Sequence, residues 1–197
     1  APHLFFLQDI DGDDRADQLG LDHVLGRQAV GPDDVLVQPG VVERGVPDLA
    51  GHCARLNRSA GALMITPTME TDTIVAIVRE GLRAYGKDQA VYIRPMYWAL
   101  VGSSLGVAPK MGATGFAISL EEIPMPSADS ATTLTRTRFR RPVMEDNVCD
   151  AKAGCLYPNN ARMLVEAQSR GFGNALVADA MGNVAESATA NVFMVRD

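Results

Sequence analysis

The sequence predicts an α+β protein made of two units. Apolar residues recur at helical spacing after Pro47, and stretches typical of strands follow at 90–99 and 114–120. A segment rich in proline and small residues, 122–130, then separates these signals from a second set of strand and helix signals. With 197 residues and 47% hydrophobic content, the chain can bury a sizeable core.

Two helices are expected in the first unit. The first runs from Pro47 through Leu63, because leucines at 49, 56 and 63 recur every seven residues, with Cys53 and Ala60 between them. The second begins with Thr71 or Asp72 as the N-cap and stops at Gly86. Its predicted inward face consists of Ile74, Ile77, Val78 and Leu82.

The second unit should contain a strand, a helix and a hairpin. The strand spans about 132–139, and the helix runs from about Asn159 to Arg170 and ends at Gly171. The hairpin pairs 175–179, through a turn at 181–183, with a strand from Val184 onward that includes 191–195. We therefore expect a small N-terminal domain at 1–123, a linker at 124–131 and the first part of a larger domain at 132–197; residues 1–46 support no firm assignment.

Composition excludes several classes of partner. The formal net charge is −6, from 18 basic and 24 acidic residues with no basic run, so a nucleic-acid partner is not expected. Cys53, Cys149 and Cys155 fit neither a zinc ribbon nor a disulfide framework, which favours a reducing, cytoplasmic location and no metal. Neither a signal peptide nor a membrane span is expected.

Three short motifs point to functions that their context contradicts. The segment 102–106 matches the nucleophile elbow G-x-S-x-G, but 107–110 breaks the helix that must follow, and all histidines precede the serine. The acidic segment 9–14 lacks the glycine and glutamate spacing of an EF-hand and is expected to be a solvated turn. Gly171 and Gly173 begin a dinucleotide fingerprint but follow a helix, so we expect them to cap it.

One lysine and one glutamate carry the chemistry that the sequence favours. Lys152 lies among small, mostly uncharged residues, with Tyr157 five positions later; partial desolvation of such an amine favours Schiff-base formation. Taken alone, such a lysine is far more often exposed and inert. Glu186 lies in an apolar stretch followed by hydroxylic residues, and a buried carboxylate needs a cationic partner such as a protonated pyridine nitrogen.

These segments resemble the fold-type IV pyridoxal-phosphate enzymes, and most closely their branched-chain amino acid aminotransferases. The resemblance covers about 47–197 and is carried by 151–195, by the strand segment 92–95 (Tyr-Ile-Arg-Pro) and by the helix segment 52–60 (His-Cys-Ala-Arg-Leu-Asn-Arg-Ser-Ala). It implies a pyridoxal 5'-phosphate cofactor and transfer of the amino group of leucine, isoleucine or valine to 2-oxoglutarate by a ping-pong route through pyridoxamine phosphate. It also implies a homodimer or higher homo-oligomer.

The resemblance also implies roles for individual residues. Lys152 would hold the cofactor covalently and move the substrate proton, Glu186 would pair with the pyridine nitrogen, and Tyr157 would hydrogen-bond the phenolate oxygen. Arg55 would bind the cofactor phosphate, a planar fork meeting an anion. Arg94 and Arg141, the latter beside Arg140, would bind substrate.

The chain departs from the family pattern at both ends. The family's His-Tyr-Gly and Val-Phe-Glu-Gly-x-Arg segment has no match in 31–46, and the family continues for roughly a hundred residues past the position of Asp197. D-amino acid aminotransferase and aminodeoxychorismate lyase of the same fold remain alternatives. A non-catalytic fragment that acts only in dimerisation is the alternative from another class.

Overall fold

A computed structural model describes residues 3–6, 35–37, 47–86, 89–124, 131–194, without the side chains of the first two stretches. The acidic segment 9–14 and most of the poorly matching region 1–46 lie outside the described residues.

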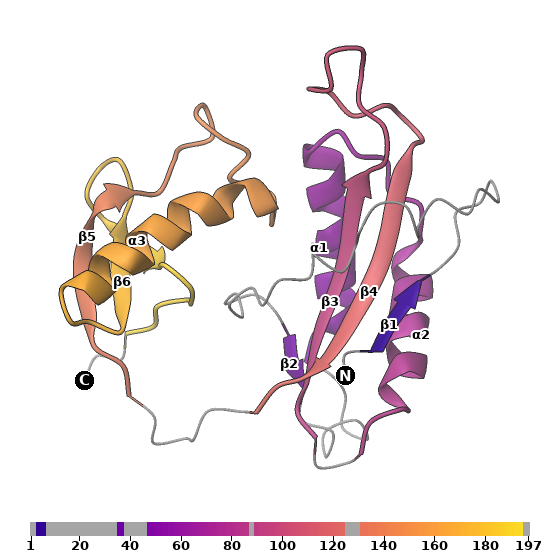
Figure 1. The fold of residues 1–197 in the computed structure, drawn as a ribbon, viewed down its shortest axis with the longest axis horizontal. Helices are drawn as coiled ribbons and strands as arrows, with labels where there is room; N and C mark the ends of the chain where they lie inside the picture. Colours follow the sequence, from indigo (N-terminus) through magenta and orange to yellow (C-terminus); the bar gives the residue numbers. More distant parts are fainter. Residues whose placement is uncertain (1–2, 7–34, 38–46, 87–88, 125–130, 195–197) are drawn as a thin grey trace.

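The first sheet is four-stranded and antiparallel (Figure 1). Its strand order is β1-β4-β3-β2, so the long hairpin of β3 and β4 forms the centre. The strands are β1 (His3–Phe6), β2 (Val35–Val37), β3 (Val91–Ala99) and β4 (Thr114–Glu122). The two central strands confirm the sequence-based expectation for 90–99 and 114–120, whereas β1 and β2 come from the region for which the sequence supported no assignment.

Two helices, α1 (Leu49–Ala62) and α2 (Thr71–Leu82), pack on this sheet, as the heptad leucines and the i, i+4 apolar pattern predicted. The core between the helices and the sheet is formed by buried residues of α1, α2, β3 and β4. These residues are Leu49, Cys53, Ile74, Val78, Leu82, Val91, Ile93, Phe116, Ile118 and Leu120.

The bounds of α2 correct two expectations. Thr71 is the first helical residue, and Glu70 is the N-cap without a side-chain hydrogen bond, so neither Thr71 nor Asp72 caps the helix. The helix ends at Leu82 rather than at Gly86, because the chain tightens there into turns in which the Arg83 N–H bonds the Glu80 carbonyl. The predicted inward residues are nevertheless buried or packed against the core.

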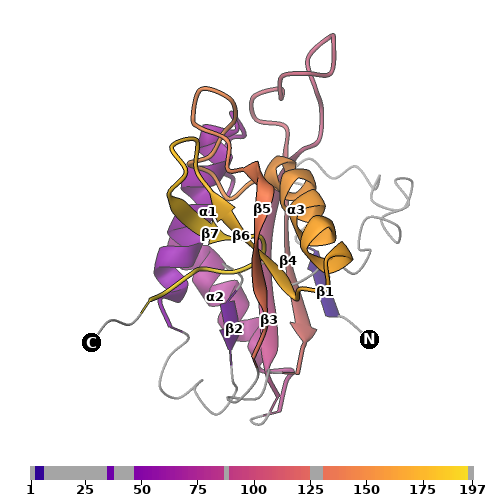
Figure 2. The same ribbon diagram turned by 90° about the vertical axis from the view of Figure 1, so that its left-hand side faces the viewer.

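The second sheet combines a parallel and an antiparallel pair. Strand β5 (Leu134–Arg140) runs parallel to β6 (Asn174–Ala178), and α3 (Tyr157–Ser169) makes the crossover between them. Strand β7 (Val184–Ser187) then pairs with β6 as an antiparallel hairpin. Figure 2, a view turned by 90°, shows β5, β6 and β7 with α3 alongside.

The hairpin strand stops earlier than expected. The Ser187 hydroxyl donates to the Ala190 carbonyl and accepts from the Ala190 N–H, which bends the chain after β7. Residues 191–194 therefore lie outside any strand, so the expectation of a strand through this stretch was wrong there.

Glycines explain how α3 ends. Gly171 has a φ of 82°, its N–H bonds the Gln168 carbonyl, and the Phe172 N–H bonds the Ala167 carbonyl. This is the capping role expected for the Gly-Phe-Gly segment. The nucleophile-elbow match at 102–106 lies in the turn between β3 and β4 and is followed by no helix, as its context indicated.

The fold is α+β, as predicted. The described residues contain separate core clusters for the first sheet and for the second, the latter centred on Met163, Ala167, Ala175 and Val177. The division at 1–123, 124–131 and 132–197 stays a prediction. No helix in the described ranges is long and apolar enough to cross a bilayer, and those ranges hold no cluster of metal-ligating side chains.

Candidate functional site

Lys152 lies in the loop that connects β5 with α3. Its neighbours Ala151 and Ala153 are both 4% exposed, while Lys152 itself is half-buried. The Lys152 Nζ lies 6.0 Å from the centroid of the Tyr157 ring, and Tyr157 is the first residue of α3. The two buried alanines thus anchor the loop, and the Lys152 amine points toward Tyr157, which was predicted to share its site.

The main chain of Lys152 is tied to the first unit. Its N–H donates to the Oγ of Ser59 on α1 at 3.0 Å, across 93 positions of sequence. Arg55 lies one helical turn before Ser59, so both side chains lie on the same side of α1. This contact brings the helix of the predicted phosphate-binding arginine against the loop of the predicted cofactor lysine.

Arg55 has a histidine partner that the sequence did not single out. An Nη of Arg55 lies 3.1 Å from Nδ1 of His52, three residues earlier. Because a guanidinium is always a donor, Nδ1 acts as the acceptor and the proton of a neutral imidazole belongs on Nε2. His52 therefore helps to orient the guanidinium of Arg55.

Two predicted site residues form an ion pair. An Nη of Arg141 lies 2.8 Å from Oε1 of Glu186, and each side chain is 24% exposed. Glu186 is opposite Val177 of β6, and Arg141 follows β5, so the pair spans the central strand of the sheet. Salt screens a partly buried pair of this kind less than it screens a pair on the surface.

Arg94 has a different environment. Its guanidinium donates to the Tyr92 hydroxyl at 3.2 Å and 3.3 Å and stacks over the Tyr92 ring at 4.8 Å. Strand alternation places Tyr92 and Arg94 on the face of β3 opposite Val91 and Ile93, which pack toward the helices. The structure gives no contact between Arg94 and the other predicted site residues in the part of the chain it describes.

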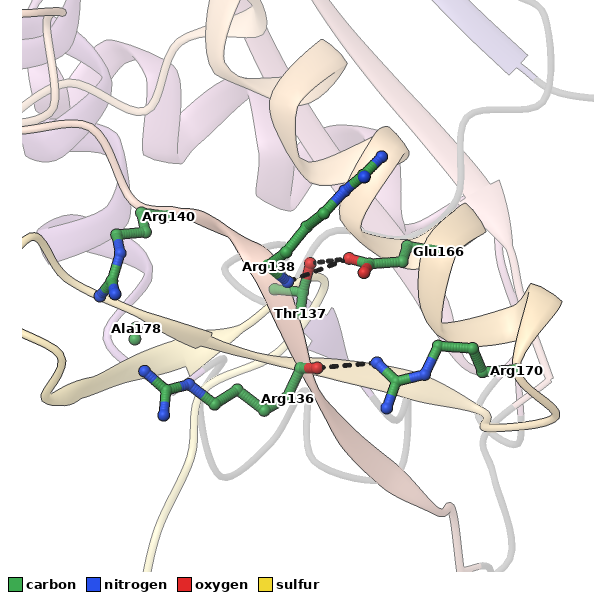
Figure 3. Close-up of a pocket in the computed structure, with 7 residues that line it drawn as sticks. All are labelled: Arg136, Thr137, Arg138, Arg140, Glu166, Arg170 and Ala178. Atoms are coloured by element: carbon green, nitrogen blue, oxygen red, sulfur yellow. Dashed lines mark hydrogen bonds between the residues drawn. The ribbon is translucent and has the colours of Figure 1, made fainter.

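A pocket of about 340 Å³ lies elsewhere, along β5 and α3 (Figure 3). Its lining residues are Arg136, Thr137, Arg138, Arg140, Glu166, Arg170 and Ala178. An Nη of Arg140 donates to the Asp179 carbonyl at 2.7 Å, and one of Arg170 donates to the Arg136 carbonyl at 2.9 Å. These arginines brace the strand and turn, and Lys152, Tyr157 and Glu186 do not line this pocket.

The hydrogen bond from the Thr137 hydroxyl is the main reason why the pKa of Glu166, in this pocket, is lowered. The Arg138 N–H donates to the same carboxylate at 3.1 Å and adds to this effect. The carboxylate therefore joins α3 to β5.

Of the two neighbouring arginines, Arg141 contacts Glu186, whereas Arg140 contacts the turn after β6. Sequence reasoning missed His52 and Ser59 as site residues, although both lie in the segment 52–60 that carries the family resemblance. Their spacing to Arg55, three before and four after, was the signal that could have identified them.

The described contacts bring Lys152 close to Tyr157 and join its loop to the helix of Arg55, while Glu186 contacts Arg141. Together, the predicted site residues would suit a phosphorylated pyridine aldehyde. An amine, an anion-binding guanidinium on a neighbouring helix, a phenol and a carboxylate are the groups that such a molecule requires. Comparison with known proteins identifies the family. The family model for amino-transferase class IV matches residues 37–197. The chain belongs to the class IV aminotransferases.

Solved structures of aminotransferases resemble the chain as well. An aminotransferase from Brucella abortus, bound to the co-factor PLP, is 56% identical with a TM-score of 0.73, covering 76% of this chain and 53% of that one. A branched-chain aminotransferase from Thermoproteus uzoniensis with norvaline is 26% identical with a TM-score of 0.61, covering 71% of this chain and 47% of that one. These likenesses confirm the fold predicted from the sequence.

Among curated relatives, a probable branched-chain-amino-acid aminotransferase from Rickettsia typhi is 30% identical over 150 residues. The match covers 76% of this chain and 51% of the relative. The chain thus spans about half the length of the curated relatives it matches.

Proposed function

We propose that the chain binds pyridoxal 5'-phosphate through Lys152 and belongs to an enzyme that transfers the amino group of branched-chain L-amino acids to 2-oxoglutarate. The observation that carries the proposal is the hydrogen bond between the Lys152 main chain and Ser59 on the helix of Arg55. Family membership supports the reaction class, and the PLP described in the Brucella abortus relative supports the cofactor. The names of the curated relatives support the substrate class.

The proposed roles follow from the donor set. Arg55, oriented by His52, binds the phosphate, and Tyr157 donates to the phenolate oxygen. Glu186, which contacts Arg141, would provide the carboxylate for the pyridine nitrogen. When bound, pyridoxal phosphate supplies the electron sink that makes the substrate Cα–H acidic. The Lys152 amine would take the proton from the substrate Cα and deliver it to C4′ of the cofactor within the same half-reaction, and it would carry out the reverse transfer in the second half.

Substrate recognition is assigned to arginines. Arg94 and Arg141 are the proposed contacts for substrate carboxylates, since a guanidinium fork matches a carboxylate. The family resemblance further supports a homodimer or higher homo-oligomer in the cytoplasm.

The first test concerns Lys152. Addition of pyridoxal phosphate should produce the absorbance band of the lysine-bound cofactor, and borohydride reduction followed by peptide mass mapping should find the adduct on Lys152. The Lys152→Ala variant should lose both signals, while Lys110→Ala, in the exposed turn between β3 and β4, should keep them.

A wild-type protein without the band would refute the proposal and favour a non-catalytic fragment. If the band forms, a substrate panel separates the related activities. Leucine with 2-oxoglutarate should be consumed by a branched-chain aminotransferase, D-alanine by a D-amino acid aminotransferase, and aminodeoxychorismate would release pyruvate in a lyase.

A further inference from the structure

Ser59 is one of three buried polar residues in the described part of the chain, with Thr137 and Ser187. The hydroxyls of Thr137 and Ser187 bond within the second unit, to Glu166 and Ala190. Ser59, 4% exposed, bonds instead to the main chain of Lys152 in the other unit. A buried hydroxyl is costly unless it is hydrogen-bonded, so this position has a specific partner to explain it.

The helix that carries Ser59 is firmly held. Leu49, Cys53 and Ala60 of α1 are buried against the first core. Ser59 and Arg55 lie roughly a third of a turn around the helix from that apolar face, given about 3.6 residues per turn. The helix therefore presents Arg55 and Ser59 from a rigid support, separated by one turn along its axis.

Local backbone hydrogen bonds also hold the loop that carries Lys152. The Ala151 N–H bonds the Val148 carbonyl at 3.4 Å, a long bond, and the Leu156 N–H bonds the Ala153 carbonyl at 3.1 Å. The bond from the Lys152 N–H to Ser59, at 3.0 Å, connects this loop to another helix. Without the hydroxyl, a partly buried N–H would lose its acceptor and the loop would lose its link to α1.

We propose that Ser59 is a positioning residue that fixes the distance between the phosphate-binding Arg55 and the amine of Lys152. This inference rests on the proposed function. The phosphate and the reactive carbon of pyridoxal phosphate belong to one rigid ring system, so the protein groups that bind them must stand a set distance apart. Ser59 sets that distance because it joins the lysine loop to the arginine helix one turn from Arg55.

The test compares Ser59→Ala with Ser59→Thr, which keeps a hydroxyl, and with Ser169→Ala, a control at the exposed end of α3. Hydrogen exchange of a peptide covering 148–156 reports on the Lys152 N–H without any cofactor. Titration with pyridoxal phosphate, followed at the lysine-bound band, reports on affinity. We expect Ser59→Ala to exchange faster and to bind about tenfold more weakly, the loss of one buried hydrogen bond.

We expect Ser59→Thr to restore protection and affinity, and Ser169→Ala to match wild type in both. If Ser59→Ala does not fold, Ser59→Cys with its weaker acceptor takes its place and should bind less tightly than Ser59→Thr. If Ser59→Ala keeps the hydrogen-exchange protection and the pyridoxal phosphate affinity of the wild type, the positioning role of Ser59 is overturned, while the proposed function still stands. A wild-type protein that holds no pyridoxal phosphate on Lys152 would refute the proposed function itself, and the positioning role with it.

Discussion

Cys53 shows how burial at a single position alters chemical reactivity. Its side chain, on α1, is 0% exposed in the first core, and burial raises the pKa of its thiol from 9.0 to about 11. A rise of this size lowers the thiolate fraction near pH 8 about a hundredfold. Cys155 is exposed, and the half-buried Cys149 lies with its Sγ 3.1 Å from the Pro142 carbonyl.

The three thiols should therefore react at different rates with a chromogenic disulfide reagent at pH 8. Cys155 should react first, and Cys53 should react only after denaturant exposes it. Cys155→Ser should remove the fast phase and leave the denaturant-dependent phase unchanged. Rapid reaction of all three thiols in the native protein would contradict the buried position of Cys53.

The ion pair of Arg141 and Glu186 shows why a choice between neighbouring residues needs coordinates. The sequence does not distinguish Arg140, the last residue of β5, from Arg141, which follows the strand. Arg141 reaches Glu186 at 2.8 Å, whereas Arg140 reaches the Asp179 carbonyl. This contact places Arg141, and not Arg140, beside the carboxylate proposed to pair with the cofactor.

At the scale of elements, α3 and β5 are joined by the Glu166 carboxylate. The Thr137 hydroxyl donates to it and lowers the pKa of Glu166 below its ordinary value of 4.5. A carboxyl whose folded pKa is lowered stabilises the fold fully above its unfolded pKa. That stabilisation is lost as the pH falls through the folded value.

Thr137→Val keeps the volume and removes the hydroxyl, so the pKa of Glu166 should rise toward its ordinary value. The acid unfolding midpoint, followed by circular dichroism, should then move to higher pH, with stability near neutral pH also reduced because Thr137 is buried. Thr135→Val is the matched control, two residues earlier on β5 with no side-chain hydrogen bond among the described residues. An acid midpoint equal to that of the control would show that this contact does not govern the carboxyl.

At the scale of the whole molecule, the two sheets have their own cores. Ile74 and Val78 are 0% exposed in the first core, and Met163 and Ala167 are 1% exposed in the second. Separate cores are what the predicted division at 124–131 requires, since a domain has a core of its own.

Ile74→Ala should test that division. The cavity should cost about 2–5 kcal/mol of unfolding free energy, measured by denaturant titration. In this variant, faster hydrogen exchange should be concentrated in α1, α2, β3 and β4. In Met163→Ala, the faster exchange should instead be concentrated in α3 and β6. An equal loss of protection in both sheets would indicate a single cooperative unit instead.

The sequence alone determined most of the regular structure and the family. Helix α1, strands β3 to β6 and the glycine end of α3 follow from local signals, namely apolar periodicity, strand alternation and glycine at a left-handed position. Lys152, Tyr157 and Glu186 could be singled out because their small and hydroxylic neighbours are visible along the chain. The bounds of α2 and the early end of β7 were misjudged, since caps and bends depend on which carbonyls and hydroxyls accept hydrogen bonds.

Only the tertiary structure decided which residues meet. The pairings of β1 with β4 and of β2 with β3 join short segments whose own patterns indicate no strand. The bond of Ser59 to Lys152 and the pair of Arg141 with Glu186 connect residues 93 and 45 positions apart. Periodicity carries information over a turn or a few residues, whereas such contacts depend on how whole elements pack, because packing is fixed by the summed burial of many side chains.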